Sequence, residues 1–254
     1  MVDSALALVK ELVGRSTKIL CFTGAGVSTN SSIPDFRGPK GLYLTRSPTY
    51  FSDFMASEDA RIEYWSFKRD SFPAFRDARP NATHLAIAEL ERLGRLEAVV
   101  TQNVDGLHRL AGSSAEKVIE LHGTGAEGKC TACGWREPLA ACLERFERAL
   151  SPPRCASCSE LMQPAVVMFG QSLEPATLRG ANAAAERADL VLSLGSSLTV
   201  TPAANVPLVA VRRRVPYVVV NRGATPHDEL ATLKLDMDVD DVVPPAVEAL
   251  RRSL

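Results

Sequence analysis

The sequence lacks both the long apolar runs of a membrane protein and the basic excess of a nucleic-acid-binding protein. No stretch of its 254 residues approaches the roughly 20 apolar residues that a transmembrane helix needs. Its 29 Lys and Arg against 30 Asp and Glu leave a net charge of −1. Because such a balance attracts neither nucleic acid nor anionic lipid, we expect no membrane association and no specific nucleic-acid partner.

A secretory signal is also missing from the first residues. The segment Met1–Gly14 carries Asp3, Lys10 and Glu11 within an amphipathic pattern, whereas a signal peptide has a basic start and an apolar stretch. The sequence therefore predicts a cytoplasmic protein. In that reducing compartment the 6 cysteines are expected to be metal ligands or buried thiols rather than disulfides.

Short apolar runs alternate with amphipathic helical patterns along the chain. This alternation predicts an α/β fold whose parallel sheet is covered by helices on both faces. The predicted strands are 18–23, 98–101, 118–121, 165–169, 190–194 and 217–220, and the predicted helices are 5–13, 84–93, 175–187, 204–214 and 241–251.

Two stretches interrupt this alternation. Residues 38–79 are rich in aromatic and charged residues without a clear strand, which predicts an inserted helical module. Residues 124–163 hold two cysteine pairs and a helical pattern at Leu139–Leu150, which predicts a second, small inserted module. The sheet domain would then comprise residues 1–37, 80–123 and 164–254.

The cysteine pairs have the spacing of a zinc site. Cys130-x-x-Cys133 and Cys155-x-x-Cys158 are separated by 21 residues, and each pair can form a knuckle with both sulfurs facing one ion. Four thiolates would leave no position for water, so we expect one structural Zn²⁺ per chain, stabilising a module too small for its own core. A chance grouping of reduced thiols, or a redox pair, is the alternative. Cys21 and Cys142 are expected to be buried small side chains.

A glycine-rich turn follows the first predicted strand. In Thr23-Gly24-Ala25-Gly26-Val27-Ser28 the glycines would let backbone N–H groups approach a pyrophosphate. Thr29 stands where a strict G-x-G-x-x-G fingerprint has its third glycine, so the turn alone is a weak indication of dinucleotide binding, and a simple strand-to-helix connection is the alternative.

Polar groups also stand at the ends of the other predicted strands. In a parallel sheet these ends meet at one edge, so we expect their side chains to converge in one crevice. The clusters are Gln102-Asn103-Val104-Asp105, Leu121-His122-Gly123, Gly195-Ser196-Ser197 and Asn221, with Ile33-Pro34-Asp35-Phe36-Arg37-Gly38 close behind the glycine turn.

Taken together, these motifs resemble the sirtuins of the bacterial type, which are NAD-dependent protein deacylases. The resemblance covers residues 5–250 and rests on GAGVST, IPDFRG, RPNATH, TQNVDGLH, ELHG, the two cysteine pairs, VVMFG, GSSLTV and VVVN. It implies a Rossmann-like NAD-binding domain with a zinc module and a helical module. It also implies transfer of an acyl group from a protein lysine to the ADP-ribose of NAD, with release of nicotinamide.

The resemblance assigns roles to individual residues. His122 would be the general base, since an imidazole can accept a proton from a ribose hydroxyl near neutral pH, and Asn103 would orient the ribose and a water. An extended peptide would pair with an edge-like strand formed by Val167, Met168, Phe169 and Gly170. The NAD contacts would be Gly24, Ala25, Gly26, Ser28, Asp35, Phe36, Arg37, Gln102, Asn103, Asp105, Gly195, Ser196, Ser197 and Asn221.

Some positions depart from the family pattern. Ser32 stands where the family usually has glycine, and Gln171 where it commonly has glutamate. Branches that remove succinyl groups place Tyr and Arg three residues apart in one helix. The aligned positions here are Trp65 and Lys68, so the motif does not predict a preference for acidic acyl groups.

Two other functions are compatible with these motifs: a protein mono-ADP-ribosyltransferase using the same cofactor, and a non-catalytic sensor of NAD or ADP-ribose. The sensor is disfavoured because it needs no general base such as His122. Of the remaining residues, His84 is expected to be a helix or packing residue, His108 to support the helix at TQNVDGLH, and His227 to lie on the surface. Trp65 could be core or a wall of the acyl pocket.

Overall fold

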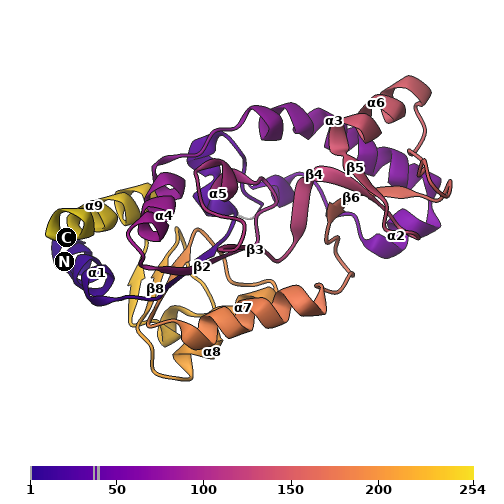
Figure 1. Cartoon of the computed structure of the whole chain (residues 1–254). Coiled ribbons are helices and arrows are strands. Elements are labelled where there is room, and N and C mark those ends of the chain that lie inside the picture. The colour runs from indigo at the N-terminus through magenta and orange to yellow at the C-terminus, as the bar shows by residue number, and fades with distance from the viewer. Residues whose placement is uncertain (1, 37, 39–40) are drawn as a thin grey trace.

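The computed structural model describes residues 2–36, 38 and 41–254, and in this part of the chain six parallel strands form the main sheet (Figure 1). In the order β3-β2-β1-β7-β8-β9, successive strands are added on one side of β1 up to β3 and on its other side from β7 onward. The topological switch point therefore lies between β1 and β7, as in dinucleotide-binding sheets. The strands are β1 (Ile19–Thr23), β2 (Leu96–Thr101), β3 (Val118–Glu120), β7 (Leu190–Leu194), β8 (Tyr217–Val220) and β9 (Leu233–Leu235). The predicted Rossmann-like fold is thereby confirmed.

Helices cover both faces of this sheet because its strands are apolar on both faces. All five residues of β1 are buried; Ile19 and Cys21 belong to one core cluster, and Leu20 and Phe22 to the other. Figure 1 shows one helix layer on the side of the sheet where the chain termini lie, and a second layer on the other side, below it. The first contains α1 (Val2–Arg15), α4 (Ala82–Arg92) and α9 (Val243–Ser253), and the second α7 (Pro175–Arg187) and α8 (Val206–Val211).

A smaller lobe is built from both insertions together. Its antiparallel sheet has the order β5-β4-β6, with β4 (Gly123–Cys130), β5 (Arg136–Pro138) and β6 (Met162–Val166). Around it lie α2 (Phe51–Ala56), α3 (Glu58–Asp77) and α6 (Leu139–Ala149), on the right of Figure 1. Trp65 is fully buried and packs on Phe146 with ring centroids 6.4 Å apart, so it is a core residue. One apolar cluster therefore joins α3 to α6 and Met162.

The remaining elements are short. A four-residue helix, α5 (Leu107–Leu110), follows β2. Single 3₁₀ turns span Ala25–Val27, Thr29–Ser31, Leu42–Leu44, Ala203–Asn205, Asp228–Leu230 and Val239–Asp241. Among the described residues, no helix combines the length and apolar character needed to cross a bilayer.

The strand predicted over 165–169 is wrong in both its bounds and its sheet. β6 ends at Val166 and pairs antiparallel with β4, so it belongs to the lobe. Residues 167–170, predicted to be an edge-like strand, lie outside any strand, and Phe169 makes only a single bridge to Tyr50. The positive φ of +84° at Gly170 turns the chain away from an extended course.

The surface position predicted for His227 is also wrong. The residue is 5% exposed, and its Nδ1 lies 3.0 Å from the hydroxyl of Tyr217 in β8. A turn causes this burial: the backbone N–H and the hydroxyl of Thr225 both donate to the Asp228 carboxylate, which folds the segment back over the sheet.

Candidate active site

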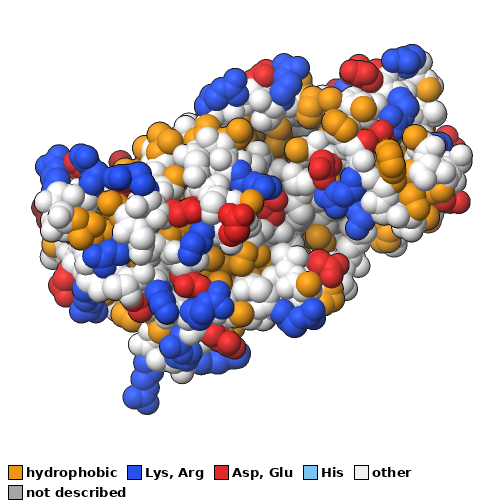
Figure 2. Space-filling view, viewed as in Figure 1, with side chains coloured by type: hydrophobic (Ala, Val, Ile, Leu, Met, Phe, Trp, Pro, Cys, Tyr) orange, Lys and Arg blue, Asp and Glu red, His pale blue; other side chains and the backbone are white. Residues whose placement is uncertain are grey.

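A cleft of about 1200 Å³ lies where the strand ends of the main sheet face the smaller lobe. Figure 2 shows the surface hollowed between these two parts of the molecule. Every described residue that was predicted to contact NAD, to act catalytically or to bind the peptide lines this cleft, from Gly24 to Asn221, whereas the four predicted zinc ligands lie outside it. Arg37, predicted to face phosphate, lies outside the described residues.

Two turns form the floor of the cleft and lie in direct backbone contact. The Gly26 N–H donates to the Gly195 carbonyl oxygen at 2.8 Å. Gly195 has a φ of +59°, and a Cβ added to it would lie 2.4 Å from the backbone nitrogen of Val27. Only glycine fits this position, because any side chain would push the turn after β7 away from the turn after β1.

We therefore expect Gly195→Ala to disrupt the cleft. The overlap with Val27 and the unfavourable φ should lower the free energy of unfolding by about 2–4 kcal/mol and weaken dinucleotide binding at least tenfold. Chemical denaturation and NAD titration of the same variant measure both effects.

Gly180→Ala is the matched control, because Gly180 lies within α7 and a Cβ there would meet nothing within 4 Å. It should stabilise the protein by about 0.5–1 kcal/mol and leave binding unchanged. A Gly195→Ala variant that behaved like this control would show that the two turns can separate without cost.

Asn103 and Asp105 are held against the first turn by a hydrogen-bond network. The Asn103 amide donates from Nδ2 to the Gly24 carbonyl and to Ser28 Oγ, both at 3.1 Å. The Ser28 hydroxyl donates to Asp105 Oδ2 at 2.7 Å, and the Leu107 N–H donates to Asp105 Oδ1 at 2.9 Å. These bonds fix both side chains relative to the glycine turn.

His122 follows β3 and lines the same cleft. Its Nδ1 lies 3.0 Å from the carbonyl oxygen of Gln102, which can only accept, so Nδ1 carries the proton and Nε2 is the acceptor in the neutral ring. Burial lowers the pKa of His122 more than the bond to that carbonyl raises it, so the imidazole is neutral at physiological pH. Gln102 donates in turn from Nε2 to Ser196 Oγ at 2.8 Å.

Two further histidines lie behind the glycine turn and outside the cleft. His108 is buried with Nε2 3.0 Å from Thr23 Oγ1, and burial lowers its pKa to about 3. His84 is also buried, completes the capping box of α4 with Asn81, and its ring centroid is 4.8 Å from that of His108. The predicted packing roles of both are confirmed.

The positions that depart from the family pattern have clear structural roles. Ser32 adopts the left-handed region with a φ of +65°, which explains why glycine suits this position. The Gln171 side chain accepts the N–H of Met168 at 2.9 Å and so closes the turn that carries Phe169. A neutral amide performs this task without adding charge to the cleft.

Sequence reasoning missed an aromatic and basic wall of the cleft. Its missed ring is Tyr43, whose centroid lies 5.2 Å from that of Phe36 and 5.9 Å from that of Phe169, two residues that the sequence analysis did predict. Arg46 and Phe67 complete this wall on the side of the smaller lobe. No motif marks Tyr43, Arg46 or Phe67, because the first two lie in a loop that holds one 3₁₀ turn and Phe67 lies on α3.

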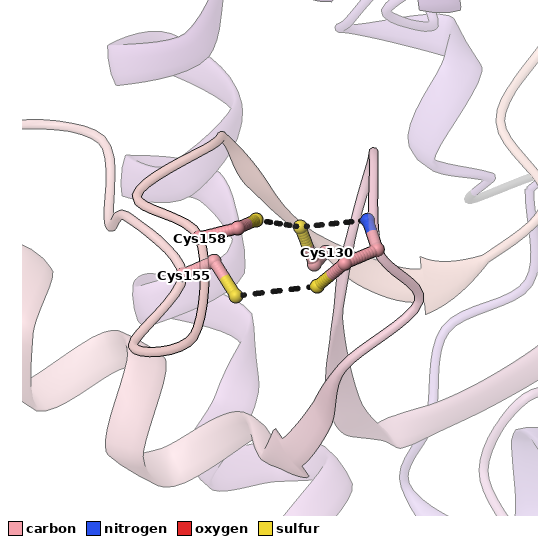
Figure 3. A group of neighbouring side chains, drawn as sticks. Cys130, Cys155 and Cys158 are labelled. Carbon is pink, nitrogen blue, oxygen red and sulfur yellow. Dashed lines mark hydrogen bonds between the residues drawn. The ribbon is translucent and has the colours of Figure 1, made fainter.

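The four cysteines of the smaller lobe converge on one point (Figure 3). Their sulfurs all lie within 4.8 Å of one another, with 3.5 Å between Cys130 and Cys158 and 3.7 Å between Cys133 and Cys155. Tetrahedral zinc with bonds of about 2.3 Å separates its sulfur ligands by about 3.8 Å. Backbone N–H groups of Ala132 and Ser157 point at these sulfurs, as suits thiolates. The donor set and its geometry therefore fit one structural zinc ion.

Comparisons with known proteins agree with this geometry. The family model described as "Sir2 family" matches residues 24–202. "NAD-dependent protein deacetylase 2" of Streptomyces coelicolor is 44% identical over 241 residues, covering 93% of this chain and 97% of that protein. The "NAD-dependent protein deacetylase" of Thermotoga maritima is 43% identical over 230 residues, covering 90% and 92%.

Solved structures of Sir2 enzymes also resemble this chain over nearly its whole length. A complex described as "Sir2-p53 peptide-NAD+" superposes with a TM-score of 0.82 at 39% identity, covering 95% of this chain and 94% of that one. A Sir2 variant with a deacetylated p53 peptide and 3'-O-acetyl ADP-ribose gives a TM-score of 0.87 at 38% identity, covering 98% of both chains.

Proposed function

Because the chain belongs to the Sir2 family, we propose that it is an NAD-dependent protein-lysine deacylase, most simply a deacetylase. The observation that carries this proposal is the neutral imidazole of His122, whose Nδ1 is engaged by Gln102 and whose Nε2 is left as an acceptor in the cleft. A binding module would need no such base.

The cleft is large enough for the cofactor. Its floor is formed by two glycine turns in contact with each other at the topological switch point of the sheet, where dinucleotides bind in such folds. When bound there, NAD supplies the ADP-ribose that accepts the acyl group and nicotinamide as the leaving group. We assign Gly24, Gly26 and Gly195 to the pyrophosphate side, and Asn221 to the adenosine side.

His122 then acts as the general base. Its Nε2 accepts a proton from a ribose hydroxyl, and the Gln102 carbonyl stabilises the resulting imidazolium through Nδ1. Asn103 orients the ribose and a water, and Asp105 offers its carboxylate to the nicotinamide amide. The buried networks that hold both residues exclude other water from the reacting groups.

Acylated lysines of proteins are the proposed substrates, with the peptide lying along residues 167–170. The complex with a p53 peptide among the solved relatives supports a peptide ligand. Backbone bonds from Val167 to His122 and from Phe51 to Phe169 hold this segment at the cleft although it is not a strand.

A structural Zn²⁺ at Cys130, Cys133, Cys155 and Cys158 is also part of the proposal, because the four sulfurs fit a tetrahedral ion. We also propose the reducing cytoplasm as the compartment, because a four-thiolate site requires its cysteines to stay reduced.

The function is tested by incubating the protein with NAD and an acetyl-lysine peptide and analysing the products by mass spectrometry. Deacylation should give nicotinamide, free lysine peptide and O-acetyl-ADP-ribose in equal amounts. Protein carrying ADP-ribose would favour the transferase, and unconsumed NAD would favour the sensor.

The pH dependence of the reaction should report the environment of His122. A general base is active only when neutral, so kcat/KM falls on acidification through the pKa of the free enzyme's imidazole. Because burial lowers that pKa, the midpoint should lie below about 6.5, the ordinary value for histidine. A rate profile across the acidic range measures it, and a midpoint above the ordinary value would contradict a desolvated base.

A further inference from the structure

Lys68 occupies an unusual environment on the lobe side of the cleft. It projects from α3 and lines the cleft, with its Nζ 5.4 Å from the ring centroid of Tyr64 and 5.8 Å from that of Phe67. None of the ion pairs among the described residues includes it.

The other described lysines are placed differently. Lys117 and Lys234 each donate to two backbone carbonyls, at 2.6–3.2 Å. Lys10, Lys18 and Lys129 are exposed to water. Lys68 alone among the described lysines has an ammonium group that is partly buried against aromatic rings.

A second cation lies beside it. The guanidinium carbon of Arg46 is 4.4 Å from the Phe67 ring centroid, so both cations lie around one ring. Arg46 is paired with Glu63 at 3.0 Å, and that carboxylate lies on the exposed side. The carboxylate therefore pairs with Arg46 and not with Lys68, and from the exposed side it screens the Arg46 charge only in part.

An amine in such surroundings is activated as a nucleophile. Desolvation and a neighbouring positive charge both disfavour the ammonium form and leave a larger fraction of free amine. Burial, with a smaller contribution from Arg46, lowers the pKa of Lys68 to about 8. The open cleft provides the path by which an electrophile reaches it.

We propose that Lys68 is a covalent modification site within the cleft, acylated by small thioesters. The free amine attacks the thioester carbonyl carbon, a C–N amide bond forms, the C–S bond breaks, the thiolate leaves and the amine proton passes to solvent. The product is a neutral amide lying against Tyr64 and Phe67, which leaves Arg46 as the single cation at the Phe67 ring among the described residues.

This modification would also change the cleft. An acyl group on Lys68 fills space on the wall formed by α3, so longer acyl substrates should be turned over less well than acetyl-lysine. That consequence rests on the proposed deacylase function, whereas the acylation itself does not.

The test uses the purified full chain with S-acetyl-N-acetylcysteamine, a small acetyl thioester, near neutral pH and without NAD. Peptide mass spectrometry follows acetylation of each lysine with time. Lys68 should react about tenfold faster than Lys10, Lys18 and Lys129, because the gain in free amine exceeds the loss of intrinsic nucleophilicity. Equal or slower labelling of Lys68 would overturn the proposal. Since NAD is absent, this outcome is independent of whether the protein is a deacylase.

Two variants test the cause of the reactivity. Arg46→Gln removes the neighbouring cation and should slow labelling of Lys68 several-fold, with Lys129 in the same molecule as internal reference. Arg15→Gln removes an exposed cation paired with Glu11 and should change nothing. An Arg46→Gln protein that labels at the parental rate would contradict the activation described here.

Discussion

Replacing His122 by alanine should reduce kcat/KM for an acetyl-lysine peptide by about 10³-fold, within the range of about 10²–10⁴ for loss of a general base. The reason is that Nε2 of the neutral ring is the acceptor that the cleft offers to a ribose hydroxyl. Steady-state measurement of peptide deacylation with saturating NAD gives the value.

The same variant should keep its fold and its affinity for NAD. His122 contributes one side-chain hydrogen bond to the described structure, and the glycine turns that form the floor of the cleft do not depend on it. Thermal unfolding and NAD titration are the controls. Turnover within a few-fold of the parent would remove His122 from the reaction.

Replacing Cys155 by alanine should abolish zinc binding and unfold the smaller lobe. Structural zinc sites contribute apparent binding free energies of about 10–16 kcal/mol, which exceeds the whole stability of many domains, about 5–15 kcal/mol. Zinc content should fall from one ion per chain to far below one, and activity should be lost because the lobe forms one wall of the cleft. Elemental analysis and circular dichroism measure the two effects.

Cys142→Ala is the matched control. Its thiol is buried in the same apolar cluster, but it donates to Glu137 at 3.2 Å and does not belong to the four-sulfur group. This variant should keep one zinc per chain. A parent protein with well under one zinc per chain, or a Cys155→Ala protein with normal content, would refute the site.

The main sheet could be predicted because its strands carry strong local signals. β7, β8 and α7 have the predicted bounds, since continuous apolar runs and a proline at the helix start mark them. β9 was missed because Leu233–Leu235 is too short to show a period. β4 was missed because Gly123–Cys130 contains three glycines and one buried apolar side chain, Cys130.

The candidate site could be predicted as far as the chain topology determines it. Parallel strands end at one edge, so His122, Asn103 and Ser196 had to approach one another. The aromatic and basic wall could not be predicted, because Tyr43 and Arg46 lie in a loop with one 3₁₀ turn and Phe67 lies on α3, where no motif marks them. Position 227 was misplaced for a similar reason, since a turn at Thr225 buries it.

The strand order has a consequence for how the nascent chain emerges from the ribosome. β1 pairs on one side with β2 and on the other with β7, whose first residue follows β1 by roughly 170 residues. At translation rates of about 5–20 residues per second, the edge of β1 that faces β7 stays open for roughly 10–30 s. Both insertions are synthesised within that interval, so the growing polypeptide exposes an apolar strand edge that invites chaperones or aggregation until Leu190–Leu194 arrives.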